Sequence, residues 1–282
     1  MSALGDPYQM TGPSALAGGW RRFWNLCLLL ALTDWRLRFF GSALGYLWSL
    51  MRPLMLFGVV YTVFAEVLAV GSDVKYYAVV LLMGIIAYEY FAEATGNAVP
   101  SVVDRENFVR KVHFPRLAIP VAITLTSTLN LLLNLVVLVF FFVISGVEPH
   151  WGWLQAPFLL VLLVAFSAGI ATLLSALFVP FRDISPIWDV ILRALFYATP
   201  VLYPIELLAR HSETLAQVAM CNPLAVFIQQ FRHAVIDPTA PSAAAAIGGA
   251  VYLLIPGAIL VGTIALGLYV FNRMAPHVAE QL

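Results

Sequence analysis

Two carboxylate residues interrupt an apolar stretch at a spacing that could serve a polar passage through a membrane. Glu89 and Glu93 are four residues apart, so a helix would place both on one face. A charged group inside a bilayer costs about 2.5–3.5 kcal/mol on insertion scales, and such residues therefore face a cavity or a partner. The pair predicts either the wall of a hydrophilic pathway or two structural ion pairs with Arg105 or Arg110 near the cytoplasmic end.

Aromatic side chains are dense in the same parts of the chain. Sugar rings have apolar faces that stack on aromatic rings, so an aromatic-lined passage would suit a glycan. Aromatic residues also belong in membrane cores and interface belts, so the pattern by itself allows both interpretations. The candidates for lining a translocation pathway are Phe57, Tyr61, Phe64, Tyr88, Glu89, Tyr90, Glu93 and Tyr197.

No motif in the sequence provides a catalytic centre or a source of energy. A phosphate-binding loop is absent, because neither of the two lysines, Lys75 and Lys111, follows a glycine. The sequence also contains no H-E-x-x-H metal motif and no G-x-S-x-G nucleophile motif. We therefore expect a transport protein, with no metal site and no catalytic residues, that is driven by a component outside this chain.

The composition requires membrane-spanning helices to position these residues. Of the 282 residues, 62% are hydrophobic and 11% are charged, against about 25% charged in soluble domains. The mean hydropathy is +0.91. About 20 apolar residues span a bilayer as a helix, and six stretches qualify, approximately 46–70, 76–98, 117–145, 154–179, 187–203 and 247–271. The fifth stretch is short and contains Pro200 and Pro204, so it could end part-way or continue as a broken segment.

The distribution of cationic residues predicts that both termini are cytoplasmic. With that orientation, twelve of the 15 Lys and Arg residues lie at the inner side and three at the outer side. Residues 20–40 carry aromatic residues at helical spacing, which favours an amphipathic helix in the inner interface over a short extra span. Cys27 and Cys221 then lie on opposite sides of the membrane and cannot pair within one chain.

We expect one all-α, polytopic membrane domain with six transmembrane helices. Residues 101–114 form the most charged loop and predict a cytoplasmic docking element. Residues 204–241 mix apolar pieces with polar breaks, which predicts short re-entrant helices in the outer leaflet. The predicted segments are a cytoplasmic tail (1–19), the interfacial helix (20–40), the six-span domain (41–273) and a second cytoplasmic tail (274–282).

Four segments, in order along the chain, resemble the permeases of bacterial ABC exporters for polysaccharides such as O-antigen, capsule and teichoic acid. They are DWRLRFFGSALGYLWSLMRPL, ENFVRKVHFPRLAIP, FRDISPIWDVILRALFYATPVLYP and CNPLAVFIQQFR. The positions that match the motifs of the family are Leu44, Gly45, Trp48, Pro53, Lys111, Phe114, Pro115, Arg116, Pro120, Arg182, Asp183, Pro200, Tyr203, Pro204, Asn222, Pro223 and Arg232.

This resemblance implies a type-2 ABC exporter permease that works as a homodimer with two copies of a separate ATPase, which binds ATP and Mg²⁺. The loop between the second and third spans would dock on the ATPase, with help from the turn before the fifth span. The implied ATPase-coupling residues are Asp104, Arg105, Glu106, Asn107, Arg110, Lys111, His113, Arg182 and Asp183. The implied outer gate includes Tyr203, Asn222, Pro223 and Arg232. Glu89, Glu93 and His113 match none of the motifs of the family, so no individual role carries over to them, and His113 is included only as part of the coupling loop.

A lipid-linked glycan combines an anionic pyrophosphate head, a hydrophilic chain and an apolar tail. On the resemblance, Arg36, Arg38 and Arg52 would admit the head from the inner leaflet, or they set topology and bind anionic lipid. We expect export of such a glycan (O-antigen, teichoic acid or cell-wall galactan) across the bacterial plasma membrane. The alternative is an ABC exporter permease for a drug or a small lipid. A secondary transporter is disfavoured because the sequence shows no internal repeat. A membrane-embedded enzyme is disfavoured because no nucleophile with a positioned base is evident.

Overall fold

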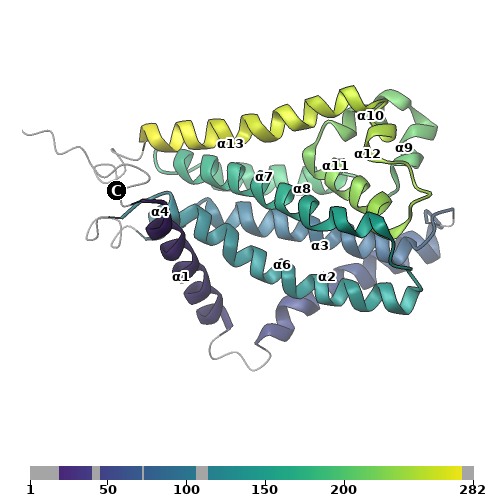
Figure 1. Ribbon diagram of the computed structural model, residues 1–282, viewed down its shortest axis with the longest axis horizontal. Helices are drawn as coiled ribbons and strands as arrows, with labels where there is room; N and C mark the ends of the chain where they lie inside the picture. Colours follow the sequence, from purple (N-terminus) through teal and green to yellow (C-terminus); the bar gives the residue numbers. More distant parts are fainter. Residues whose placement is uncertain (1–18, 40–44, 72, 106–113, 275–282) are drawn as a thin grey trace, which may run out of the picture.

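The computed structural model describes residues 19–39, 45–71, 73–105 and 114–274, and the regular elements in these ranges are all helical. Long helices run side by side along the molecule, while α1 (Trp20–Phe39) is inclined to them at one end (Figure 1). Within the described ranges, five stretches are long and apolar enough to cross a membrane: Leu47–Val67, Tyr77–Ala98, Ala118–Ser145, Trp151–Leu177 and Ala250–Met274. The expectation of an all-α, polytopic membrane protein is therefore confirmed.

The fifth predicted span is shorter in the structure than in the sequence prediction. Its helix, α8 (Ile184–Ala198), has 15 residues and rises about 22 Å at 1.5 Å per residue, less than the roughly 30 Å of hydrocarbon in a bilayer. Thr199 is extended, and turns follow up to Pro204. Proline has no N–H donor and restricts the residue before it, so the helix ends where the prolines begin. A sixth crossing stays a prediction.

The bundle is centred on α3 (Tyr77–Ala98), the helix that carries the two glutamates. It packs against α2 (Tyr46–Tyr61), α6 (Ala118–Ser145), α7 (Ala156–Leu177) and α8. The ring of Phe91 is fully buried and stacks on Phe166 of α7, with 5.6 Å between centroids. Most of α3 is buried, as expected for a helix that is apolar nearly all round. Glu89, Glu93 and Asn97 lie on its partly exposed stripe.

Two glycines allow α13 (Leu254–Met274) to approach α7 closely. A Cβ built on Gly267 would lie 2.5 Å from the carbonyl oxygen of Gly169, and one built on Gly169 would lie 2.9 Å from the side chain of Ile264. Small residues at such crossings let helix backbones pack against each other inside a membrane. This contact fixes the last long helix against the rest of the bundle.

We expect Gly267→Ala to destabilise the protein, because the added methyl group cannot avoid the backbone of α7. Overpacking of this kind costs about 1–3 kcal/mol. Thermal unfolding of the purified protein in detergent measures the effect. Gly262→Ala on the same helix is the matched control, because a Cβ there meets no atom within 4 Å. Equal melting temperatures for the two variants would contradict the close crossing.

Short helices gather at the end of the bundle opposite α1, α4 (Ser101–Asp104) and Met274 (Figure 1). They are α9 (Ile205–His211), α10 (Glu213–Met220), α11 (Pro223–Phe231), the π-helical turn Arg232–Ile236 and α12 (Ala243–Ala246). Side-chain N-caps precede three of them: the hydroxyls of Ser212 and Ser242 accept from the amides of Leu215 and Ala245, and the Asn222 carboxamide oxygen accepts from the Leu224 amide. The segment 204–241 thus forms short helices, as its broken apolar pattern predicted.

Candidate functional site

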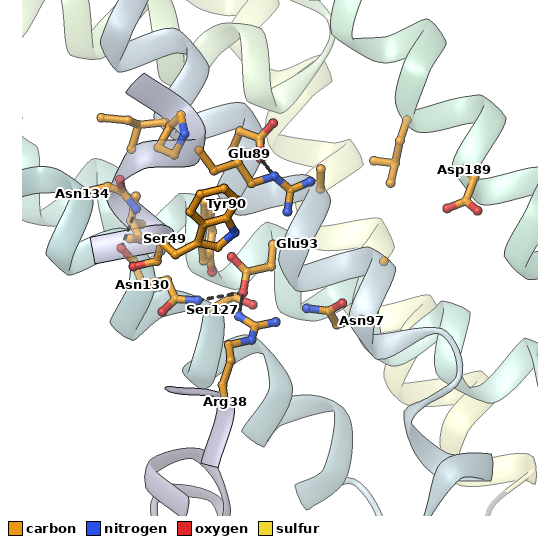
Figure 2. Close-up of a pocket in the computed structure, with 18 of the residues that line it drawn as sticks. Arg38, Ser49, Glu89, Tyr90, Glu93, Asn97, Ser127, Asn130, Asn134 and Asp189 are labelled. Carbon is orange, nitrogen blue, oxygen red and sulfur yellow. Dashed lines mark hydrogen bonds and ion pairs between the residues drawn. The ribbon is translucent and has the colours of Figure 1, made fainter. Parts of the chain in front are cut away.

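A polar cavity of about 600 Å³ lies where α1, α2, α3, α6 and α8 meet (Figure 2). Glu89 is the thirteenth of the 22 residues of α3, so the cavity reaches the middle of a helix long enough to span the membrane. Buried polar groups need partners, and a cavity with many of them suits a polar ligand or water. The polar residues that line it are Arg38, Ser49, Arg52, Glu89, Tyr90, Glu93, Asn97, Ser127, Asn130, Asn134 and Asp189.

Glu93 joins three helices at one side of this cavity. The guanidinium of Arg38 on α1 donates to Glu93 Oε1, and Asn130 Nδ2 on α6 donates to the same oxygen over 2.8 Å. Figure 2 shows the three side chains pointing toward one another. The indole of Trp35, one turn before Arg38, donates to Asn130 Oδ1 over 2.9 Å. The charge of the carboxylate is therefore balanced, and α1 is held against α3 and α6.

Glu89 has a looser partner. Its Oε2 lies 3.6 Å from Nε of Arg52 on α2, and the side chain of Arg52 is 74% exposed while that of Glu89 is 30% exposed. An ion pair at this distance and exposure contributes little to stability. Arg52 is consequently a cation at the open side of the cavity that a ligand anion can engage at small cost.

The structure brings together only part of the predicted pathway. Glu89, Tyr90 and Glu93 line the cavity together with Arg38 and Arg52, whereas Arg36 is exposed and is not among its lining residues. The sequence allows two interpretations of the glutamates, as the wall of a pathway or as partners of Arg105 or Arg110, and Arg110 lies outside the described residues. Their partners are arginines of α1 and α2, and not Arg105, which contacts a different residue, Asp34.

The other predicted aromatic residues lie away from the cavity. Tyr88 is buried, and its hydroxyl donates to the Leu192 carbonyl of α8. Phe57 and Tyr61 have ring centroids 5.5 Å apart, and both pack against the apolar core. Phe64, in the π-helical end of α2 (Thr62–Val67), also packs there. Tyr197 is 67% exposed on α8.

Arg105 connects the predicted coupling loop to α1. Its guanidinium donates to Asp34 Oδ2, one turn before Arg38 on the same helix, and both side chains are mostly buried. Asp104 is exposed at the end of α4. Arg182 and Asp183 are exposed in the turn before α8. The guanidinium carbon of Arg182 lies 5.0 Å from the centroid of the Phe178 ring. The other predicted coupling residues, Glu106, Asn107, Arg110, Lys111 and His113, lie outside the described residues.

The residues predicted for an outer gate lie in one connected region. Arg232 is 4% exposed and forms two contacts of 2.9 Å with the carboxylate of Glu206 on α9. A bidentate pair of this kind between an arginine and a carboxylate fixes the relative orientation of the two side chains. Asn222 Nδ2 donates to Thr199 Oγ1 over 3.0 Å, and Pro223 begins α11. The Tyr203 hydroxyl donates to the carbonyl of Tyr197 over 2.9 Å. The contact between Asn222 and Thr199 holds the end of α8 against α11, and the pair of Arg232 and Glu206 joins two of the short helical segments to each other.

The sequence prediction did not include Asp34 or Asp189. Asp34 is the only acidic residue in an arginine-rich segment, and its importance depends on the proximity of Arg105, 71 positions away. Asp189 and Arg193 are charged residues inside an apolar stretch, and that signal alone marks candidates for function in a membrane protein.

The two cysteines allow a test of orientation. Cys27 is fully buried on α1, and burial raises the pKa of its thiol to about 12, so it carries almost no reactive thiolate near neutral pH. Cys221 is partly exposed among the short helices. We expect a membrane-impermeant maleimide, added outside intact cells, to label Cys221 and not Cys27. Cys221→Ser should abolish the signal. Labelling of Cys221 only after the cells are opened would contradict outward-facing short helices.

Comparisons with known proteins place this chain among membrane permeases. The family model described as ABC-2 type transporter matches residues 25–236. The chain is similar to an O-antigen export system permease protein RfbA of Klebsiella pneumoniae, with 28% identity over 259 residues that cover 92% of this chain and 95% of the relative. It is also similar to the RfbA protein of Myxococcus xanthus, which has the same description, with 25% identity over 219 residues, or 78% and 83% of the two chains.

Proposed function

The chain belongs to the ABC-2 type transporter family, and we propose that it is the membrane-spanning subunit of an ATP-driven exporter for a lipid-linked polysaccharide. Relatives that align with most of its length are described as O-antigen export permeases. The observation that carries the proposal is the cavity lined by arginines, carboxylates and amides at the depth of the membrane. A drug or a small lipid requires no passage with so many charged and amide side chains.

Energy for transport would come from a separate ATPase, which binds ATP and Mg²⁺. The sequence has no phosphate-binding loop of its own. The end of the molecule where α1, α4 and Met274 meet is proposed as the cytoplasmic docking face, because the charged loop follows α4 directly. Two copies of the ATPase would dock on two copies of this chain, with both termini in the cytoplasm and the spans in the bacterial plasma membrane.

The chemistry of the cavity fits both parts of the substrate head. Guanidinium groups bind phosphate, and carboxylates and amides accept and donate hydrogen bonds to sugar hydroxyls. In the structure each arginine faces a carboxylate. An anionic head group would engage Arg52 first, because its ion pair is longer and more exposed than that of Arg38. The freed carboxylate of Glu89 could then accept from a sugar hydroxyl.

Depletion of the chain in the bacterium that encodes it tests the proposal. We expect a lipid-linked glycan to accumulate on the cytoplasmic side and the corresponding surface polysaccharide to decline, with phospholipid composition and drug sensitivity unchanged. Re-expression of the wild-type chain should reverse both effects. Normal surface polysaccharide after depletion would refute the proposal, and a change in drug efflux alone would support the exporter of small molecules.

A further inference from the structure

An apolar groove of about 310 Å³ lies between α8 and α13, in the half of the bundle next to the short helices. α8 packs on α3, and α13 packs on α7, so α3 and α7 form the floor of the groove and the start of α11 closes one end. The stacked rings of Phe91 and Phe166 belong to this floor. Ile259, on the α13 side, is 39% exposed, so the groove is open to the surroundings of the bundle.

The polar side chains of this groove already have partners within the chain. Asn222 Nδ2 donates to Thr199 Oγ1 over 3.0 Å, and its Oδ1 accepts from the Leu224 amide. The Thr263 hydroxyl donates to the carbonyl of Leu260 over 2.9 Å. In the part of the chain that the structure describes, no charged side chain lines the groove. A sugar or an anion would lose hydrogen bonds to water here without replacing them, which costs free energy, whereas a hydrocarbon chain needs none.

The groove has the depth of one membrane leaflet. Ile259 is five residues, or about 8 Å, after the start of α13, and Ile170 is 14 residues, or about 21 Å, after the start of α7. Both helices start at the end where the short helices gather (Figure 1). The groove therefore covers about 13 Å along the bundle, against about 15 Å of hydrocarbon in one leaflet. In the proposed orientation this is the outer leaflet.

The volume of the groove favours one extended chain over a helix of another protein. A helix segment that is about 13 Å long and about 10 Å wide occupies about 1,000 Å³. The groove offers about 310 Å³. A single hydrocarbon chain is narrow enough to lie along it, and a helix is not.

We infer that the groove binds one acyl chain of a phospholipid from the outer leaflet. Phospholipid surrounds a site inside the bilayer at high concentration, so even a weak site is filled by mass action. The chain would contact Leu195 on α8 and Ile259 on α13, and would thus join two helices that pack on different neighbours. The ligand is the same whatever molecule the exporter moves, so the inference goes beyond the proposed function.

Photocrosslinking of the reconstituted protein tests this site. The vesicles consist of phosphatidylcholine and phosphatidylglycerol, with a small share of phosphatidylcholine that carries a diazirine near the end of one acyl chain. After irradiation, peptide mass spectrometry locates the label. We expect label on Ile170, which is only partly exposed and lies at the deep end of the groove. Label on Val261, which is 64% exposed on α13, reports lipid that only touches the outside. Label on Val261 without label on Ile170 would overturn the inference.

Variants that fill the groove provide the second measurement. In Ile259→Trp the indole would occupy the groove from the α13 side, so the label on Ile170 should be lost. Val261→Trp is the matched control, because it adds the same side chain to the outside of the same helix, and it should keep the label. Leu195→Trp fills the groove from α8 and replaces Ile259→Trp if that variant does not insert. Undiminished label on Ile170 in the filled variant would overturn the inference.

Competition distinguishes a phospholipid from the tail of the exported molecule. An excess of lipid-linked glycan from the bacterium, without a diazirine, is added to the same vesicles. We expect the label on Ile170 to stay unchanged. Its loss would assign the groove to the tail of the substrate and overturn the assignment to phospholipid. The measurements need neither ATP nor export, so their outcome is separate from that of the proposed function.

Discussion

Glu93→Lys is expected to abolish export while the protein still inserts into the membrane. The substitution removes the acceptor for Arg38 and Asn130 and places a second cation beside Arg38. Hydrogen bonds to charged groups contribute about 1.5–3 kcal/mol each, and about 1.4 kcal/mol is a factor of ten. We therefore expect the amount of surface glycan, measured in a strain that depends on the variant, to fall at least about tenfold.

Companion variants separate the role of this carboxylate from a general effect of charge. Glu93→Gln keeps an acceptor for Asn130, so its loss should be smaller. Arg38→Glu combined with Glu93→Lys restores opposite charges and should recover part of the export. Glu66→Lys is the control, because Glu66 is exposed at the far end of α2. Export by Glu93→Lys at the level of the Glu66→Lys control would show that the cavity has no part in transport.

Arg105→Asp is expected to separate ATP hydrolysis from export. Arg105 lies in the segment predicted to dock on the ATPase, directly after α4, and its ion pair with Asp34 is a polar contact between this segment and α1. The next turn of α1 carries Arg38, which reaches the cavity. Without the ion pair, movement of the loop would no longer pass to α1. We expect ATP hydrolysis by the purified complex to continue while export falls about tenfold, as for loss of a charged hydrogen bond.

Exchange of the two charges is the decisive control for this prediction. Asp34→Arg with Arg105→Asp restores an ion pair and should restore export, although each single variant lacks it. Arg210→Asp provides a matched comparison, because Arg210 pairs with Asp73 at 3.1 Å but both side chains are about 70% exposed. Such surface pairs contribute about 0–1 kcal/mol, so this variant should behave as wild type. If the variant with both substitutions exports no more glycan than Arg105→Asp, the proposed coupling between the loop and the cavity through α1 is wrong.

The sequence predicts the long helices well because a continuous run of apolar residues marks each of them, and such a run can be recognised without knowing which helices it contacts. The length of the apolar stretch alone predicts each end of α3 and α6 to within two residues of its position in the structure. The spacing of the aromatic residues predicts both ends of α1 to within one residue. The end of α8 is harder to predict. A proline both ends a helix and occurs in broken spans, so Pro200 marks the interruption but not the path of the chain beyond it.

The partners of the glutamates could not be predicted from the sequence. Arg105 follows Glu93 closely along the chain, whereas Arg38 is 55 positions away and reaches Glu93 only because α1 packs against α6. The aromatic residues show the same limit. Tyr88 and Tyr90 are two residues apart on α3, yet Tyr90 lines the cavity while Tyr88 turns to α8. Which face of a buried helix lines a cavity depends on the neighbouring helices, and residue type alone does not specify them.

On the function proposed above, this chain forms the polar passage of an exporter that is powered by a separate ATPase. Reconstitution of the purified chain into vesicles with that ATPase and a labelled lipid-linked glycan tests it most directly. We predict that the label moves from one leaflet to the other only when the chain, the ATPase, ATP and Mg²⁺ are all present, and that Glu93→Lys stops the movement. Movement at the same rate without the ATPase or without ATP would contradict the claim.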